Sequence, residues 1–270
     1  MLIKIGNFEY TECWDGVFYK KLSAYPDITV WEIQTVLDFT AYEKAHGRAC
    51  EIEAPVAVRR AIEAYQPVYA AGTRLAPPEK ITECTACPTF RGCMTDLVCH
   101  TSPVENAKAI FACGSLLSPV KWRGIPAEML AKESRNAAKD PADYFDYIMF
   151  SWGNCQAGDR LVTERRLGRL PSEAELGPGF TPGVRFYFDR DRLCRHPGAV
   201  FEGVLPIKIK DEVVLKDWVR AVVIPEPYRA EFAALVPEAL KDRTYFLNSE
   251  GLDIWAWAEK AYTFVKKLKT

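Results

Sequence analysis

Four cysteines lie close together in one short stretch, at Cys84, Cys87, Cys93 and Cys99. Zinc takes four thiolate ligands tetrahedrally, and a Cys-x2-Cys pair such as Cys84 and Cys87 is its commonest half-site. Clustered cysteines also hold iron–sulfur clusters, and a proline directly after a ligand, as at Cys87, occurs in some of those motifs. The later spacings match no standard pattern. The stretch therefore predicts either a metal site, with zinc or an iron–sulfur cluster as the metal, or a set of free thiols.

Cys99 has a second interpretation, because the residues around it, DLVCHTS, have the character of a short strand. Successive side chains of a strand point to opposite faces, so Cys99 and His100 cannot both bind one metal while the strand is intact. Cys99 can equally be a small buried hydrophobe. In that case Cys155 or Cys194 is the alternative fourth ligand.

A second chemical pattern starts where this strand ends. Pro103 opens a helix directly after the strand, and three residues of distinct type follow along it at intervals of four. The members of the pattern are His100, Thr101, Ser102, Asn106, Ile110 and Gly114. A single histidine at a strand end is most often structural, so the spacing carries the chemical interpretation.

The segment HTSPVENAKAIFACGSL resembles the first motif of the ADP-ribosyltransferase superfamily, in its branch with a His-Tyr-Glu triad. There the strand ends in His-Gly-Ser or His-Thr, and an Asn, an Ile and a Gly recur at these intervals. The resemblance implies that His100 grips the ribose of NAD and that the Thr101 backbone holds the nicotinamide amide. It also implies that Ser102 and Asn106 belong to the NAD-binding site.

The same resemblance implies a catalytic glutamate that opens a late strand. KIKDEVVLKDWVRAVVIP is similar to that region: Glu212 opens EVVL, a turn follows, and RAVVIP closes the sheet. Cleavage of the N-glycosidic bond of NAD builds positive charge on the ribose. A carboxylate within reach of a ribose hydroxyl stabilises that charge in the transition state. Glu202 is the competing carboxylate, because it interrupts an otherwise apolar strand.

The middle member of the triad departs from the family pattern. The family's strand carries a Tyr that stacks on nicotinamide, but YIMFSWGN has Met149 at that place, with Tyr147 and Trp152 nearby. Tyr147 is our candidate for the NAD site, and Tyr187 is a second choice. DarT-like DNA ADP-ribosyltransferase toxins also tolerate changes here and have a similar order of sheet and loops. The resemblance covers roughly residues 96–226.

Arginines supply candidate contacts for phosphate groups. Arginine can clamp the NAD diphosphate or contact a nucleic-acid backbone. The predicted long loop after the central strand carries Arg160, Arg165, Arg166 and Arg169, and Arg135 lies on an earlier helix. A solvated loop with partly cancelled charges is the alternative interpretation.

Hydrophobic periodicity predicts the elements that hold these residues. We expect an N-terminal α+β module over residues 1–78, a cysteine-rich connection over 79–95 and an ADP-ribosyltransferase-like domain over 96–270. The expected strands are 2–10, 16–22, 96–102, 144–152, 183–189, 199–210, 212–215 and 220–225. The expected helices are 27–47, 54–67, 103–114, 125–139, 227–243 and 249–268, with a loop over 153–183.

Composition limits the function classes. A net charge of −1 gives no support for a generally nucleic-acid-binding surface but is compatible with a local basic patch, and no apolar run is long enough for a membrane span. The nine cysteines follow no secretory signal, so we expect a reduced, cytoplasmic setting without a membrane partner.

Together these observations predict an α+β protein with an ADP-ribosyltransferase-like split β-sheet core and C-terminal helices. The resemblance implies NAD as substrate, nicotinamide release and transfer of ADP-ribose to an acceptor, with nucleic acid as the first guess. The tRNA phosphotransferase group shares the fold and NAD but needs a denser basic pocket. A non-catalytic metal-binding or nucleic-acid-binding adaptor organised by the Cys84–Cys99 cluster is the alternative from a different class.

Overall fold

The computed structural model describes residues 1–8, 11–14, 17–75, 95–133 and 142–268. The chain forms two compact units, each assembled from separate stretches of sequence. Unit 1 consists of Met1–Met94, Ser118–Tyr147 and Val200–Lys210, and unit 2 of Thr95–Leu117, Ile148–Ala199 and Asp211–Thr270. This division differs from the continuous domains expected from the sequence, because two later stretches belong with the N-terminal part.

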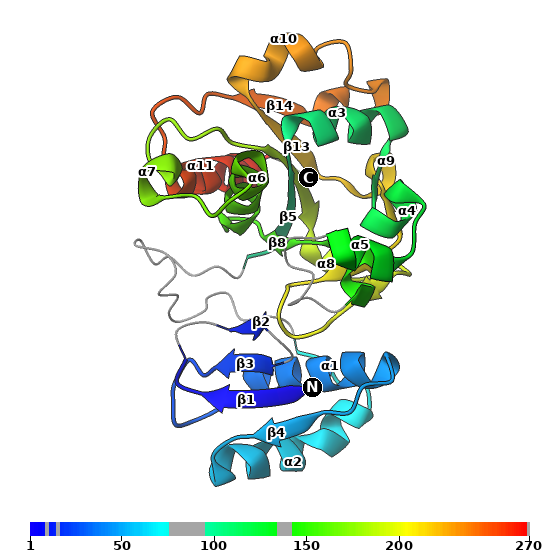
Figure 1. The fold of residues 1–270 in the computed structure, drawn as a ribbon, viewed down its shortest axis with the longest axis vertical. Coiled ribbons are helices and arrows are strands. Elements are labelled where there is room, and N and C mark those ends of the chain that lie inside the picture. The colour runs from blue at the N-terminus through cyan, green and yellow to red at the C-terminus, as the bar shows by residue number, and fades with distance from the viewer. Residues whose placement is uncertain (9–10, 15–16, 76–94, 134–141, 269–270) are drawn as a thin grey trace. The chain divides into compact units, whose positions relative to one another are not determined.

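The N-terminal part of unit 1 is a four-stranded sheet with two helices (Figure 1). The strand order is β2-β3-β1-β4; β1 pairs in parallel with β3 and β4, and β2 pairs antiparallel with β3. The elements are β1 (Leu2–Gly6), β2 (Glu12–Trp14), β3 (Val17–Lys21), α1 (Val30–Ala45), β4 (Glu51–Glu53) and α2 (Val56–Ala70). The core between sheet and helices includes Phe18 and Phe39, whose ring centroids lie 4.2 Å apart. The sequence did not indicate β2 or β4.

The start of α1 is fixed by a capping box. The backbone N–H of Glu32 donates to Thr29 Oγ1 at 3.2 Å, and the backbone N–H of Thr29 donates to Glu32 Oε2 at 2.9 Å. Two orphan amide groups of the first turn are thereby satisfied. Thr29 is therefore the N-cap, two residues after the expected start of this helix at position 27.

The later stretches of unit 1 bring short elements around a buried cation. Lys208 Nζ lies 3.6 Å from Glu202 Oε2, and both side chains are fully buried. The same ammonium lies 3.9, 3.7 and 4.9 Å from the ring centroids of Tyr42, Tyr144 and Tyr147. A desolvated cation over aromatic faces is stabilised electrostatically. This cluster links α1 to both later stretches of unit 1.

The elements of this region are short. They include a three-stranded sheet of order β10-β11-β7. Their bounds are α4 (Pro119–Arg123), α5 (Ala127–Glu133), η1 (Ala142–Asp146), β7 (Tyr147–Met149), β10 (Ala199–Val200) and β11 (Lys208–Lys210).

Unit 2 is built on a five-stranded sheet of order β14-β13-β9-β5-β8 and a separate two-stranded pair, β12-β6. Its strands are β5 (Leu97–Ser102), β6 (Ser115–Leu117), β8 (Ser151–Trp152), β9 (Val184–Asp189), β12 (Glu212–Val214), β13 (Ala221–Pro225) and β14 (Thr244–Leu247). Its helices are α3 (Val104–Cys113), α6 (Ala157–Leu167), α7 (Glu173–Leu176), α8 (Arg190–Leu193), α9 (Leu215–Trp218), η2 (Glu226–Tyr228), α10 (Arg229–Phe232), η3 (Glu238–Arg243) and α11 (Ile254–Lys267).

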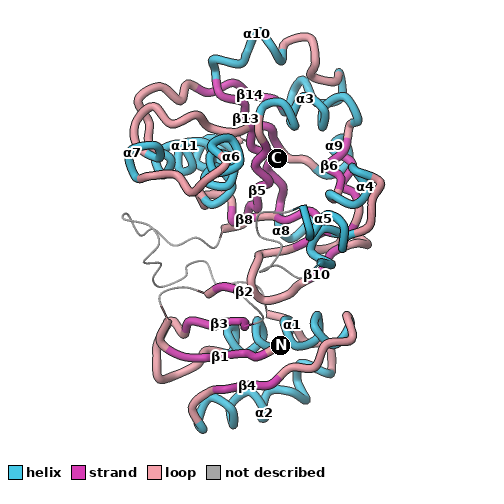
Figure 2. Tube along the Cα trace, viewed as in Figure 1, coloured by secondary structure: helices cyan, strands magenta, loops and turns pink. Residues whose placement is uncertain are grey.

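Helices cover both faces of the five-stranded sheet. Figure 2 shows α6 and α11 on one side of it and α3 on the other. Cys99 and Tyr187 pack with Trp257 of α11 on the first side, whereas Phe111 of α3 contacts Phe186 on the second, with centroids 5.8 Å apart. The alternation of side chains along β5 and β9 thus separates two cores.

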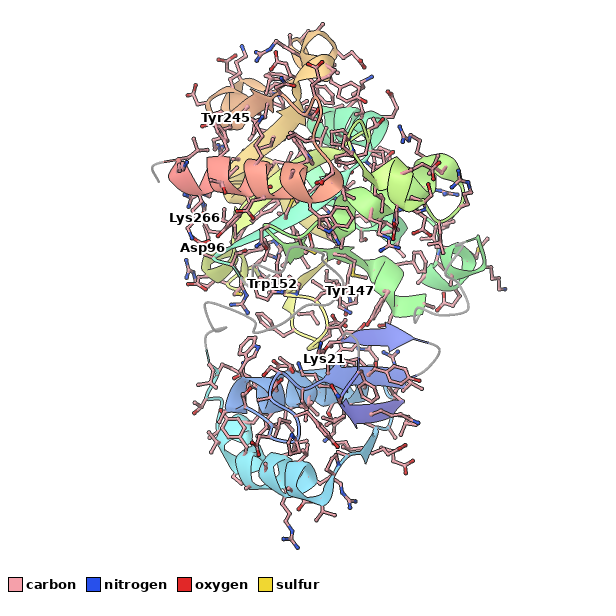
Figure 3. All side chains as sticks on the ribbon, turned by 90° about the vertical axis from the view of Figure 1, so that its left-hand side faces the viewer. Lys21, Asp96, Tyr147, Trp152, Tyr245 and Lys266 are labelled. Carbon is pink, nitrogen blue, oxygen red and sulfur yellow. The ribbon has the colours of Figure 1, made fainter. Side chains whose placement is uncertain are left out.

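The start of β5 is tied to the last helix. Tyr262 of α11 donates its hydroxyl to Asp96 Oδ1 at 3.1 Å, and Lys266 Nζ lies 5.6 Å from the Tyr262 ring centroid. Figure 3 labels Asp96 and Lys266 beside α11.

These elements confirm the expected α+β class. Within the described stretches, none of the helices has the length and apolar character that crossing a bilayer requires. Four expectations about individual elements were wrong. The expected strand 199–210 is reduced to β10 and β11, and the expected strand 144–152 is divided into η1, β7 and β8. The expected loop 153–183 contains α6 and α7, and the expected helix 227–243 is divided into η2, α10 and η3, with β14 following it.

Candidate functional site

His100 lies near the end of β5, in register with Phe186 of β9. Its Nδ1 is 3.0 Å from the carbonyl oxygen of Met149. Because a carbonyl oxygen only accepts, Nδ1 must carry the proton and donate. The other ring nitrogen, Nε2, is then an acceptor in the neutral imidazole. Of the described residues, none forms a hydrogen bond with Nε2.

The surroundings of His100 favour the neutral form of its imidazole. Burial lowers the pKa of the imidazole below its ordinary value, the hydrogen bond to Met149 opposes this, and the positive charge of Arg165 lowers the pKa further. The ring of Phe150 contacts the imidazole edge to face, with centroids 6.0 Å apart. A neutral imidazole with a fixed tautomer can accept a hydrogen bond from a hydroxyl group, such as a ribose hydroxyl.

Thr101 and Ser102 end β5 under close contact with two glycines. A Cβ at Gly158 would lie 2.4 Å from Thr101 Oγ1, and one at Gly183 would lie 2.7 Å from the Ser102 carbonyl oxygen. Ser102 is buried, with 4% of its surface exposed. Glycine at positions 158 and 183 therefore allows α6 and the segment before β9 to lie close to the end of β5.

Asn106 lies in the first turns of α3 and is exposed. The buried side chains of this helix are Ala107 and Phe111, and Ile110 is only partly buried. The pattern Asn-Ile-Gly therefore does not mark the packed face of α3. Gly114 ends the helix in the left-handed region, with φ 74°, as a C-cap glycine does.

Glu212 is the first residue of β12 and is partly buried. β12 pairs antiparallel with β6, and Glu212 Oε1 accepts a hydrogen bond from Ser115 Oγ at 2.8 Å. β6 follows directly after α3, which in turn follows β5. His100 and Glu212 thus belong to the same compact unit, joined by one helix and one strand pair.

Glu202, the competing carboxylate, belongs to unit 1. It is fully buried, pairs with Lys208 and accepts a hydrogen bond from Tyr144 at 2.7 Å. A carboxylate held by a buried cation is typical of a structural ion pair. Glu202 therefore has the contacts of a structural residue.

Neither tyrosine candidate lies in the setting expected of it. Tyr147 belongs to unit 1, where His46 Nε2 lies 3.1 Å from its hydroxyl. Tyr187 belongs to unit 2 but is fully buried on the α11 side of the sheet, and its hydroxyl accepts from Arg185 Nη1 at 3.1 Å. The aromatic residue that contacts His100 is Phe150. The run of apolar residues around it gave no sign of this contact.

The arginine segment forms a helix. Arg160, Arg165 and Arg166 lie on α6 and are exposed, and Arg169 follows it and pairs with Glu175, Nη2 to Oε1, at 2.7 Å. Arg165 lies near enough to His100 for its charge to act on the imidazole. It is therefore the member of the set that belongs to the surroundings of His100.

Of the predicted metal ligands, Cys84, Cys87 and Cys93 lie outside the described residues, as does Arg135. Cys99 is buried, and its Sγ lies 3.8 Å from Thr101 Oγ1. Burial raises the pKa of the Cys99 thiol to about 12, so the thiol is protonated in the protein without metal. In the part of the chain that the structure describes, no three His, Cys, Asp or Glu residues are grouped to hold a metal ion.

No protein-family model, no curated protein and no solved structure matches this chain.

Proposed function

We propose that unit 2 transfers ADP-ribose from NAD to an acceptor, with release of nicotinamide. The observation that carries the proposal is the presence, in one compact unit, of an imidazole of fixed tautomer at the end of β5 and a carboxylate at the start of β12. The motif around His100 and the strand pair around Glu212 resemble the ADP-ribosyltransferase superfamily.

In this scheme His100 Nε2 accepts a hydrogen bond from a ribose hydroxyl of NAD. The tautomer fixed by Met149 supports this role, because it leaves Nε2 as the acceptor nitrogen. Arg165, exposed on α6, supplies positive charge for the diphosphate. Thr101 provides backbone groups for the nicotinamide amide.

Glu212 acts on the reacting sugar. The N-glycosidic bond breaks with its electron pair going to nicotinamide, and positive charge builds on the ribose. The carboxylate stabilises that charge in the transition state, and the acceptor then forms the new bond to the sugar and loses its proton. Nucleic acid is the first acceptor to test, because the arginines of α6 fit a phosphate-bearing partner.

The test is nicotinamide release from NAD by wild type and by Glu212→Gln. We expect the substitution to lower turnover by about 100-fold or more, as removal of one electrostatic group does elsewhere, while NAD binding measured by calorimetry changes little. Asp217→Asn is a matched control, because Asp217 is an exposed carboxylate on α9 of the same unit. Absence of both NAD binding and turnover in wild type, with DNA, RNA and protein acceptors supplied, would contradict the proposal.

Zinc or an iron–sulfur cluster at Cys84, Cys87 and Cys93 is a separate proposal. Elemental analysis of purified protein, before and after a chelator, tests it. An adaptor organised by the cysteine cluster requires that the purified protein contains the metal. Absence of metal would contradict the metal site, and absence of NAD turnover in the same protein would contradict the transferase.

A further inference from the structure

Glu212 is held by a neighbour on the adjacent strand. In the antiparallel pair, Glu212 is in register with Leu117, and Val214 is in register with Ser115. Residues two apart along a strand share a face, so Ser115 lies diagonally opposite Glu212 on the same face. Its hydroxyl is 2.8 Å from Glu212 Oε1. This distance corresponds to a well-formed O–H···O bond.

Ser115 is itself fixed. Only 6% of its surface is exposed. Gly114, directly before it, adopts φ 74° at the end of α3, and its carbonyl oxygen accepts the backbone N–H of Leu215 at 2.9 Å. The start of β6 is therefore hydrogen-bonded to the chain directly after β12, which holds Ser115 beside Glu212.

The backbone before Glu212 is also constrained. Asp211 has φ 65° and, among the described residues, is the single non-glycine residue with positive φ. A left-handed residue costs about 1 kcal/mol or more, although Asp tolerates the region better than most. Such outliers concentrate where the surrounding structure fixes a functional geometry. At this position the turn sets the direction in which the chain enters β12.

We infer that Ser115 is a positioning residue that orients the Glu212 carboxylate toward the reacting sugar, an inference that rests on the proposed function. An ionised carboxylate only accepts hydrogen bonds, so Ser115 must donate. Two carboxylate oxygens together offer about four lone-pair directions, so a bond from Ser115 is compatible with a further bond from a ribose hydroxyl. Because the carboxylate matters most in the transition state, loss of this orientation lowers kcat and leaves KM for NAD nearly unchanged.

The experiment compares nicotinamide release by wild type, Ser115→Ala and Ser115→Thr. We expect Ser115→Ala to lower kcat about 10-fold, the equivalent of one orienting hydrogen bond, with KM for NAD within about twofold. Ser115→Thr keeps the hydroxyl and restores most of kcat. Ser118→Ala is the matched control, because Ser118 is a fully buried serine whose Oγ accepts the Lys121 backbone N–H at 3.2 Å. It should lower the melting temperature without changing kcat.

The outcomes separate the two proposals. If wild type releases nicotinamide and Ser115→Ala has the same kcat, the inference is wrong and the transferase function stands. Equal losses in Ser115→Ala and Ser115→Thr would show that packing and not the hydroxyl matters, which also overturns it. If wild type binds NAD in calorimetry but releases no nicotinamide with any acceptor, the proposed function fails and the inference fails with it.

Discussion

Arg185 and Asp159 form an ion pair whose side chains are both completely buried. Arg185 Nε donates to Asp159 Oδ2 at 2.8 Å, and the guanidinium also donates to the carbonyl oxygens of Gly153 and Cys155 at 3.2 and 2.9 Å. Burial alone would lower the pKa of Arg185, but the charge of Asp159 outweighs it and holds the pKa well above its usual value. The pair ties the first turn of α6 and the segment before it to β9.

Removal of one partner should leave an uncompensated buried charge. We expect Asp159→Asn to lower the free energy of unfolding by about 3–5 kcal/mol, measured by urea denaturation. Asp191→Asn is the control: the Asp191 side chain is 89% exposed and lies 3.8 Å from Arg190, so its removal should cost less than about 1 kcal/mol. Equal effects of the two substitutions would contradict a structural role for the buried pair.

The buried Lys208–Glu202 pair of unit 1 predicts a non-additive mutant cycle. Lys208→Met leaves Glu202 buried without its cation. We expect it to lower the free energy of unfolding by about 3–5 kcal/mol. The double variant Lys208→Met/Glu202→Gln removes both charges and should recover part of that loss, because neither charge then needs a partner. Unfolding free energies of the single and double variants give the coupling. Additive losses would contradict a direct interaction between the two side chains.

Gly203 should tolerate a side chain less well than Gly47, although both have positive φ, of 80° and 73°. A Cβ at Gly203 would lie 2.0 Å from the Thr35 carbonyl oxygen, whereas a Cβ at Gly47 would meet nothing within 4 Å. Gly47→Ala should therefore cost about 1–2 kcal/mol from conformation alone. Gly203→Ala should lower the free energy of unfolding by about 1–3 kcal/mol more than Gly47→Ala does, because the backbone at Thr35 must move. Thermal unfolding of the two variants under the same buffer tests the difference, and equal melting temperatures would contradict it.

His100 should make stability depend on pH on the acid side. The pKa of His100 is lower in the folded chain than in the unfolded chain, so between these two values the unfolded state binds more protons. Stability is then fully present above the unfolded pKa of about 6.5 and is lost as the pH falls through the folded value. His100→Gln should flatten this slope. His196, whose pKa burial also lowers, remains in both proteins and cancels in the comparison. An unchanged slope in His100→Gln would contradict the lowered pKa.

Elements that are marked by residues next to them in the chain were predictable from the sequence. Pro103 and Gly114 bound α3, and the β-branched runs after Glu212 and Arg220 mark β12 and β13. The strand that carries His100 was expected at 96–102 and is found at Leu97–Ser102. Each of these predictions used only residues inside the element or next to it in the chain.

Helix α6 shows why other parts were missed. Its buried face is made of Asp159, Val162 and Thr163, so the apolar periodicity that predicts a packed helix is weak. The polar side chain at 159 is tolerated because Arg185 neutralises it, and that partner lies far along the chain. The same reason explains Tyr147 and Glu202: their burial depends on Lys208, which no local pattern connects to them.

The interleaving of the two units limits what deletions can reveal. Ser118–Tyr147 and Val200–Lys210 fold with the N-terminal stretch although they are encoded inside the part that forms unit 2. A truncated chain that lacked residues 1–94 would retain both stretches but lose Tyr42, one wall of the cage around Lys208. Loss of activity in such a fragment would report misfolding as readily as loss of a function of the N-terminal sheet. Single-residue exchange in the intact polypeptide, or reconstitution from separately expressed fragments, is therefore the sounder genetic approach to the N-terminal sheet.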